Sequence, residues 1–281
     1  MTALRIVFLA LAVGVLGLLG WRSMAGHPAP VATARQAPPN VATLASAMRA
    51  APAPTSAPVP ALAPVSPSRP ASDPIGEVPE FAGFYGRLKV DFPRDYSAIL
   101  DHLGRDGSMP PADAAIWDAL RDLEQSKGIL AAQAGPAALD RFFDARSALL
   151  AGLAPLDAHR CVDFLYGMTD ASIAGFTAAH HGLVATLADR MLDAITEGRS
   201  HPGDRAAPSA ADLDAVSTGL AAFGLAPAEI GLLIDGTTPD PPLSDKRVCE
   251  IGRTYLDVLH GLPADARQRV YGLAAELLAR S

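Results

Sequence analysis

The sequence predicts an all-α domain, a multi-helix bundle or orthogonal array of about nine helices, behind an N-terminal membrane segment and a disordered Pro/Ala-rich linker. The chain is 49% hydrophobic, but much of that share is alanine, and aromatic residues make up only 6%. This composition favours helix over sheet. From residue 80 onward, apolar residues recur in steps of three and four between prolines and glycines that mark helix ends.

Residues 1–25 contain an apolar run, Ile6 to Trp21, preceded by the single charge of Arg5. The run has 16 residues, whereas a membrane-spanning helix needs roughly 20. The residues before Arg5 extend it, because a long arginine side chain can reach the interface. The segment is interpreted as an uncleaved anchor, as a secretory signal peptide cut after small residues, or as a buried core helix. In the first two cases the rest of the chain is exported.

The first interpretation places the chain in the inner (cytoplasmic) membrane, crossing it once, with its C-terminal domain exported. After cleavage the domain would instead be soluble in the periplasm or secreted. No later apolar run suggests a second span, because alanine, glycine and charged residues interrupt each one.

Residues 26–79 form the linker. Thirteen of the 25 prolines lie in it, and proline removes backbone donors and disfavours helix in the residue before it. Few large apolar side chains are present to offset the entropy of ordering. We expect a semi-rigid spacer of about 3.1 Å per residue where extended. Asn40 to Ala50, which lacks proline, is either a short docking helix or a featureless part of this spacer.

Residues 80–281 form the exported domain, long enough for one sizeable core or two small ones. This part holds 18 of the 23 basic and 28 of the 30 acidic residues, so its net charge is −10. Such a charge argues against partners that are themselves strongly anionic, namely nucleic acid and an acidic lipid surface.

The helices are predicted in chain order from their starts and stops. An aromatic cluster at Phe81, Phe84 and Tyr85 opens the domain, and the alternation around Val90 allows either a short strand or a helix that begins at Pro93. Further helices are expected from Pro93 to Gly104, Pro110 to Gly128, from Pro136, from Pro155 through Cys161 to Met168, from about residue 210 to Phe223, from Pro227 to Ile234, from Ser244 to Leu262, and from Pro263 onward.

The longest helix is predicted from Asp170, a suitable N-cap, to Gly198. Its apolar stripe follows steps of three and four and consists of Ile173, Phe176, His180, Leu183, Leu187, Met191 and Ala194.

Cys161 and Cys249 are the two cysteines of the chain. In an oxidising compartment such a pair predicts a structural disulfide. With 87 residues between the two cysteines, chain entropy would give about 4.5 kcal/mol of stabilisation. The alternative is two buried thiols that act as small apolar groups.

The sequence contains no motif for nucleophilic catalysis, phosphate binding or dinucleotide binding. His159 and Cys161 would point in different directions from one helix, and no second ligand pair follows. We therefore predict no metal and no cofactor. The candidate pocket residues are His180, His181, Phe84 and Tyr85. A hydrogen-bonded core histidine is the structural alternative for His180.

The order of anchor, linker and helical domain resembles that of the lipase-specific foldases, which are membrane-tethered steric chaperones. That family's motif is arginine, two variable residues, then Phe-Asp-Tyr. The nearest stretch, residues 140–145, has Asp140 in place of the arginine and Ala145 in place of the tyrosine. The resemblance is one of architecture and transfers no functional residue.

Two functional hypotheses follow. The first is a non-catalytic adaptor or chaperone-like domain that binds an envelope or exported protein. The alternative is an exported enzyme or small-ligand-binding protein with a site in the helical core. A deep polar pocket near His180 would favour the second hypothesis, and an exposed apolar groove would favour the first.

Overall fold

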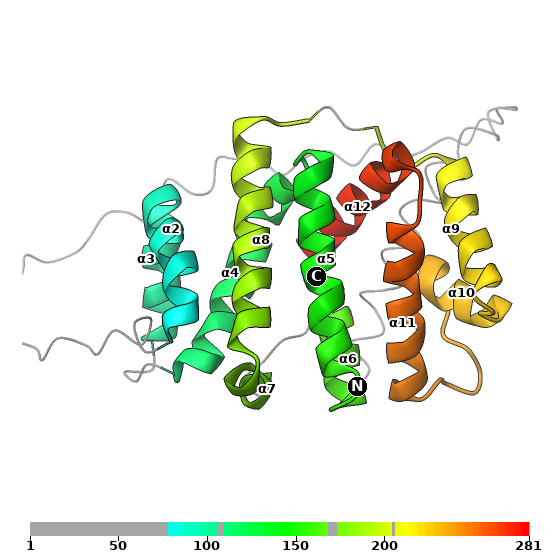
Figure 1. Ribbon diagram of the computed structural model, residues 1–281, viewed down its shortest axis with the longest axis horizontal. Helices are drawn as coiled ribbons and strands as arrows, with labels where there is room; N and C mark the ends of the chain where they lie inside the picture. The colour runs from blue at the N-terminus through cyan, green and yellow to red at the C-terminus, as the bar shows by residue number, and fades with distance from the viewer. Residues whose placement is uncertain (1–77, 106–109, 168–172, 204–205, 281) are drawn as a thin grey trace, which may run out of the picture. The chain divides into compact units, whose positions relative to one another are not determined.

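The computed structural model describes residues 78–105, 110–167, 173–203 and 206–280. The predicted membrane segment, the linker up to residue 77 and the stretch from Asn40 to Ala50 lie outside these ranges. Within them the chain forms eleven α-helices, one 3₁₀ turn and no strand (Figure 1). The all-α class is confirmed, and the expected number of about nine helices is too low. Among the described helices, none has both the length and the apolar character that a bilayer crossing requires.

The elements, in chain order, are η4 (Pro79–Phe81), α2 (Ala82–Asp91), α3 (Pro93–Leu103), α4 (Ala112–Ala131), α5 (Pro136–Leu153), α6 (Ala158–Leu165), α7 (Ala174–Ala179), α8 (His181–Ser200), α9 (Ala210–Ala222), α10 (Pro227–Asp235), α11 (Asp245–His260) and α12 (Ala264–Leu278).

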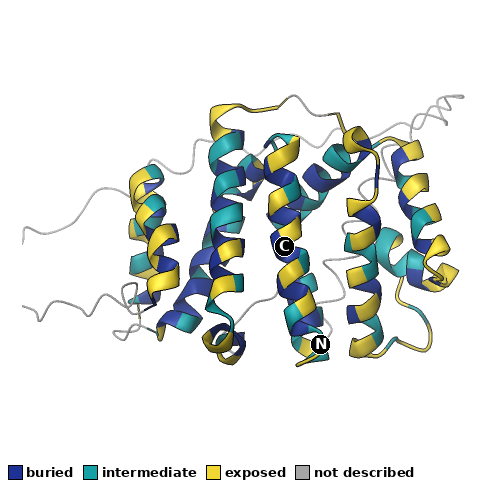
Figure 2. Cartoon of the chain, viewed as in Figure 1, coloured by how far each residue is buried: buried dark blue, intermediate teal, exposed yellow. Residues whose placement is uncertain are grey.

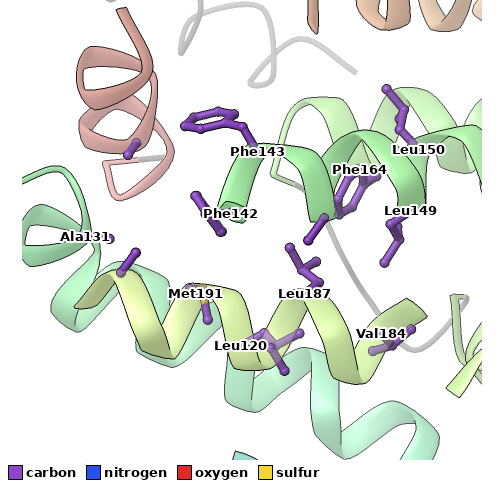
Figure 3. Packing of buried hydrophobic residues seen from close by; sticks show 14 of the residues in the cluster. Leu120, Ala131, Phe142, Phe143, Leu149, Leu150, Phe164, Val184, Leu187 and Met191 are labelled. Atoms are coloured by element: carbon purple, nitrogen blue, oxygen red, sulfur yellow. The ribbon is translucent and has the colours of Figure 1, made fainter. Parts of the chain in front are cut away.

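Helix α8 packs along both α4 and α5, and these three helices build the centre of one hydrophobic core. Helices α2 and α3 stand on one side of this centre, and α9 and α10 stand on the other side, against α11 (Figure 1). Buried residues lie on the inward sides of the central helices, and exposed residues face outward (Figure 2). The aliphatic and aromatic side chains that meet there include Leu120, Phe142, Leu149, Phe164, Val184, Leu187 and Met191 (Figure 3).

The start of the domain is helical, so the short strand considered around Val90 is wrong and the helix start at Pro93 is confirmed. Phe81, Phe84 and Leu88 are fully buried, and their spacing of three and four residues is that of one helix face. The alternation that suggested a strand covers only five residues, and Val90 is 78% exposed.

The predicted long helix is two helices, α7 and α8, separated at His180, whose backbone is not helical (φ −140°, ψ 37°). The Nδ1 atom of His180 lies 3.0 Å from the carbonyl oxygen of Phe176, and the backbone N–H of His180 donates instead to Thr177. A side chain that takes the carbonyl needed by the next helical turn competes with the helix. The apolar residues of the predicted stripe still face the core, Leu183 as a partly buried residue, whereas His180 stands at the break between the two helices.

Two helix ends also differ from prediction. Gly128 does not end its helix, because α4 continues to Ala131 with this glycine buried against Ala279, the residue after α12. Helix α6 begins after Asp157 rather than at Pro155, because the Asp157 carboxylate accepts hydrogen bonds from the backbone N–H groups of His159 and Arg160. Met168 lies outside the described residues.

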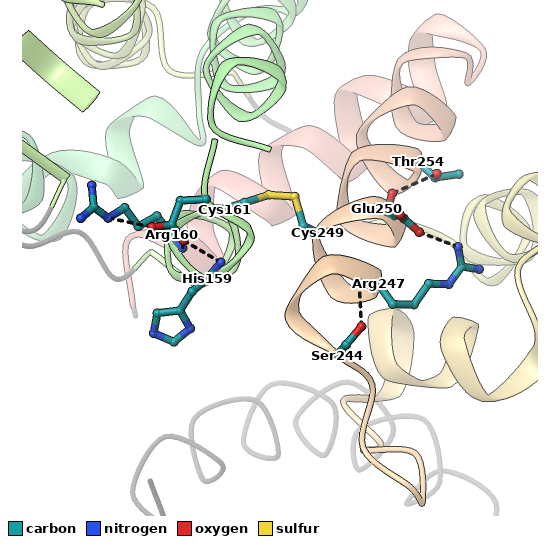
Figure 4. Close-up of a disulfide and its surroundings, with 9 residues drawn as sticks. His159, Arg160, Cys161, Ser244, Arg247, Cys249, Glu250 and Thr254 are labelled. Carbon is teal, nitrogen blue, oxygen red and sulfur yellow. Dashed lines mark hydrogen bonds and ion pairs between the residues drawn. A yellow bond between two sulfur atoms is a disulfide. The ribbon is translucent and has the colours of Figure 1, made fainter. Parts of the chain in front are cut away.

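The two cysteines lie at disulfide distance and join α6 to α11 (Figure 4). Their Cα atoms are 5.7 Å apart, and both side chains are buried. Beside them the two helices come close at Gly252, where any larger residue would collide with Leu165.

Candidate functional site

None of the four residues predicted to line a pocket lines either of the two hollows described below. Phe84 and Tyr85 are buried and contact each other edge to face inside the core. The His180 ring stacks on Phe176, with the two ring centroids 4.3 Å apart. Together with its bond to the Phe176 carbonyl, this contact gives His180 a structural role at the break between α7 and α8.

His181 is placed differently, at the start of α8. Its Nε2 atom lies 2.7 Å from a carboxylate oxygen of Asp113, and its Nδ1 atom lies 3.9 Å from Glu80. The ring also meets Phe81 edge to face. His181 thus connects three elements, η4, α4 and α8, and it lines neither of the two hollows described next.

The most unusual chemistry in the described part is a buried ion pair between Glu124 of α4 and Arg146 of α5. Arg146 donates to Glu124 over 3.4 Å and to the Phe164 carbonyl over 3.5 Å, and its guanidinium lies over the Phe164 ring. Burial raises the pKa of the Glu124 carboxyl, and the positive charge of Arg146 opposes this shift. Burial also lowers the pKa of the Arg146 guanidinium. Shifted groups beside a hollow are candidates for function.

The hollow beside this pair is a cavity of about 20 Å³, which Trp117 and Met191 also line. A cavity of this size has room for about one water molecule, whereas pockets for metabolites are typically about 300–1,000 Å³. The Nε1 atom of Trp117 donates to the Thr177 hydroxyl over 2.6 Å, which fixes the orientation of the indole. The buried pair is therefore a charged structural centre with a space of water size.

The larger hollow is an open groove of about 360 Å³ between α3 and α4. Three residues of each helix line it, and they are Asp95, Ala98, Ile99, Asp122, Gln125 and Ser126. Ile99 is buried, and the two carboxylates come from opposite helices. The groove therefore combines an apolar floor with acidic walls.

Neither hollow was predicted from the sequence. A signal for the ion pair does exist, because Arg146 interrupts the apolar stripe of α5 four residues after Phe142 and three before Leu149. The groove has no signal in any single helix, since its residues have ordinary surface character and only the packing of α3 on α4 brings them together.

No group of three or more histidine, cysteine, aspartate and glutamate residues in the described part is placed to hold a metal ion. No protein-family model, no curated protein and no solved structure matches this chain.

Proposed function

We propose that the helical domain is a non-catalytic protein-interaction module, adaptor or chaperone-like, that an N-terminal membrane segment and a proline-rich linker present outside the cytoplasm. The observation that carries this proposal is the contrast between the two hollows. The small cavity beside Arg146 has space for about one water, while the larger hollow is an open groove between two helices. Open grooves between helices suit segments of other proteins.

The location of the domain is part of the proposal. A disulfide between Cys161 and Cys249 is favoured in an oxidising compartment, which agrees with export. A linker of roughly fifty residues would let the domain reach partners well away from the membrane surface.

The experiment is cross-linking and affinity capture from intact envelopes with the tagged full-length chain. We expect one dominant partner, captured in saturable amounts and displaced by untagged chain. Capture of no protein, with the chain monomeric and stable alone, would contradict the proposal, and a metabolite screen would follow.

The alternative is an exported enzyme or ligand-binding protein, and one observation favours it. The charges of Glu124 and Arg146 lie in an apolar surrounding beside a cavity, which is the setting in which enzymes shift pKa values. A metabolite that binds to the full chain and loses affinity on Arg146→Met substitution would favour this alternative.

A further inference from the structure

We propose that the groove between α3 and α4 holds a lysine or arginine side chain from the docking segment of a partner protein. This inference rests on the proposed function and adds the chemistry of the partner.

The walls of the groove supply the charge. Asp95 of α3 and Asp122 of α4 line it from opposite sides, with side chains 21% and 28% exposed. Carboxylates bind a cation more strongly when water is partly excluded from them. The groove therefore offers a basic side chain one carboxylate on each helix.

Each of these carboxylates already has a partner on the opposite helix of the groove. Lys127 pairs with Asp95 over 2.8 Å, and His102 pairs with Asp122 over 2.8 Å. A lysine or arginine carries a permanent charge, whereas an imidazole is charged only when it is protonated, so the contact with Asp122 is the one that an entering basic side chain could take over. His102 is also half exposed and attached to an edge helix, so an entering cation can share or replace its contact.

The floor supplies the fit for a long side chain. Ile99 is buried at the base of the groove, and the methyl group of Ala98 lies beside it. Lysine and arginine pack their methylene groups on such apolar surface while the charged end binds elsewhere. Gln125 and Ser126 add polar groups at the rim. A purely aliphatic side chain would pack on this floor but could form no ion pair with either carboxylate.

Long-range electrostatics point to the same partner. Residues 80–281 carry a net charge of −10, which raises the association rate of basic segments and lowers that of acidic ones. Charge complementarity therefore favours a basic protein segment over an acidic one or an anionic membrane surface.

The test uses the full-length chain in intact envelopes, with a benzophenone-bearing amino acid at Ser126. The matched control carries the same group at Val90, which is 78% exposed on α2 and does not line the groove. We expect an adduct from position 126 and not from 90, attached to a partner segment that contains lysine or arginine. Asp122→Asn should lower the adduct yield about tenfold, the loss of one charge-assisted contact. Asp101→Asn, on the exposed side of α3, should leave it unchanged.

A charge exchange completes the test. Glutamate in place of the captured basic residue should abolish the adduct, and Asp122→Lys in this chain should restore it. The inference is overturned if the adduct segment has no basic residue, if the charge exchange restores nothing, or if the adduct is with the N-terminal part of this chain or with a second copy. An adduct from position 90 but not from position 126 would overturn only the groove assignment, while no adduct from either position would contradict the proposed function itself.

Discussion

Replacing Glu124 by glutamine leaves the charge of Arg146 in the core without a counter-ion. The two side chains are only 18% and 8% exposed, and removal of one partner of a buried pair costs about 3–5 kcal/mol. Because the separation of the pair, 3.4 Å, is long for a charge-assisted bond, we expect the lower end, about 3 kcal/mol. Removing both charges, with Glu124→Gln and Arg146→Met together, should cost less than the Glu124→Gln substitution alone.

The two single variants should differ in their response to pH. In Arg146→Met, the only charge that lowers the pKa of Glu124 is lost, so its pKa, already raised by burial, rises further. As the pH falls from 7 to 5, the folded state then binds a proton that the unfolded state does not, and the stability of this variant increases relative to wild type. The arginine of Glu124→Gln cannot release its proton, so that variant should show no such recovery.

The measurement is urea unfolding of the full-length chain in detergent, followed through the fluorescence of the buried Trp117. The control is Arg280→Met, which removes an exposed pair with Glu276 in the same helical turn and should cost less than about 0.5 kcal/mol. A loss below about 1 kcal/mol for Glu124→Gln, or a loss in Arg146→Met that stays constant between pH 7 and 5, would refute the burial of this pair.

Three further predictions concern stability. Replacing both cysteines, with Cys161→Ser and Cys249→Ser together, should lower the free energy of unfolding by about 4 kcal/mol, since the disulfide closes a long loop. Two reactive thiols in the unreduced wild-type protein after denaturation would contradict the disulfide. Gly198→Ala should cost about 1–3 kcal/mol of stability, because its new methyl group would overlap a backbone carbonyl of α4. Gly175→Ala, in open space, should be neutral or stabilising by less than about 1 kcal/mol. Equal urea midpoints for the two variants would contradict this prediction. A hydrogen bond to Asp245 and nearby acidic charges raise the pKa of His159. The ion pair of this side chain, which is 72% exposed, should therefore stabilise the fold by a few tenths of a kcal/mol below pH 6, and this effect should be lost as the pH rises through the raised pKa. A His159→Gln variant whose melting temperature follows that of the wild type across this range would contradict the prediction.

Most helices could be predicted because their boundaries are local. Prolines at the first position of α3, α5 and α10 and the Ser209 cap of α9 act within one turn of the residues they organise. The break at His180 could not be predicted in this way. It depends on one imidazole binding the carbonyl of Phe176 rather than leaving it to the helix, and the spacing of apolar residues is the same in both cases.

The buried ion pair was only partly accessible from the sequence. Arg146 stands inside an apolar stripe, which marks it as buried or as an interruption. Its partner Glu124 lies 22 positions earlier on a helix with several other acidic residues, and nothing local distinguishes it from Asp118 or Asp122. Pairing between residues of separate helices depends on how α4 and α5 are placed, and both are placed by their packing on α8 and α12.

The aromatic opening shows why the predicted pocket and the observed groove are in different places. Phe84 and Tyr85 were candidates for a pocket as part of the aromatic cluster that opens the domain, yet such large side chains fill the space between helices and are buried. The groove forms where short side chains such as Ala98 and Ser126 meet and leave space unfilled. A hollow on a helical domain is therefore better sought where small residues recur at the contact between an edge helix and its neighbour. In this chain that contact is also acidic, which is why we assign it a basic partner.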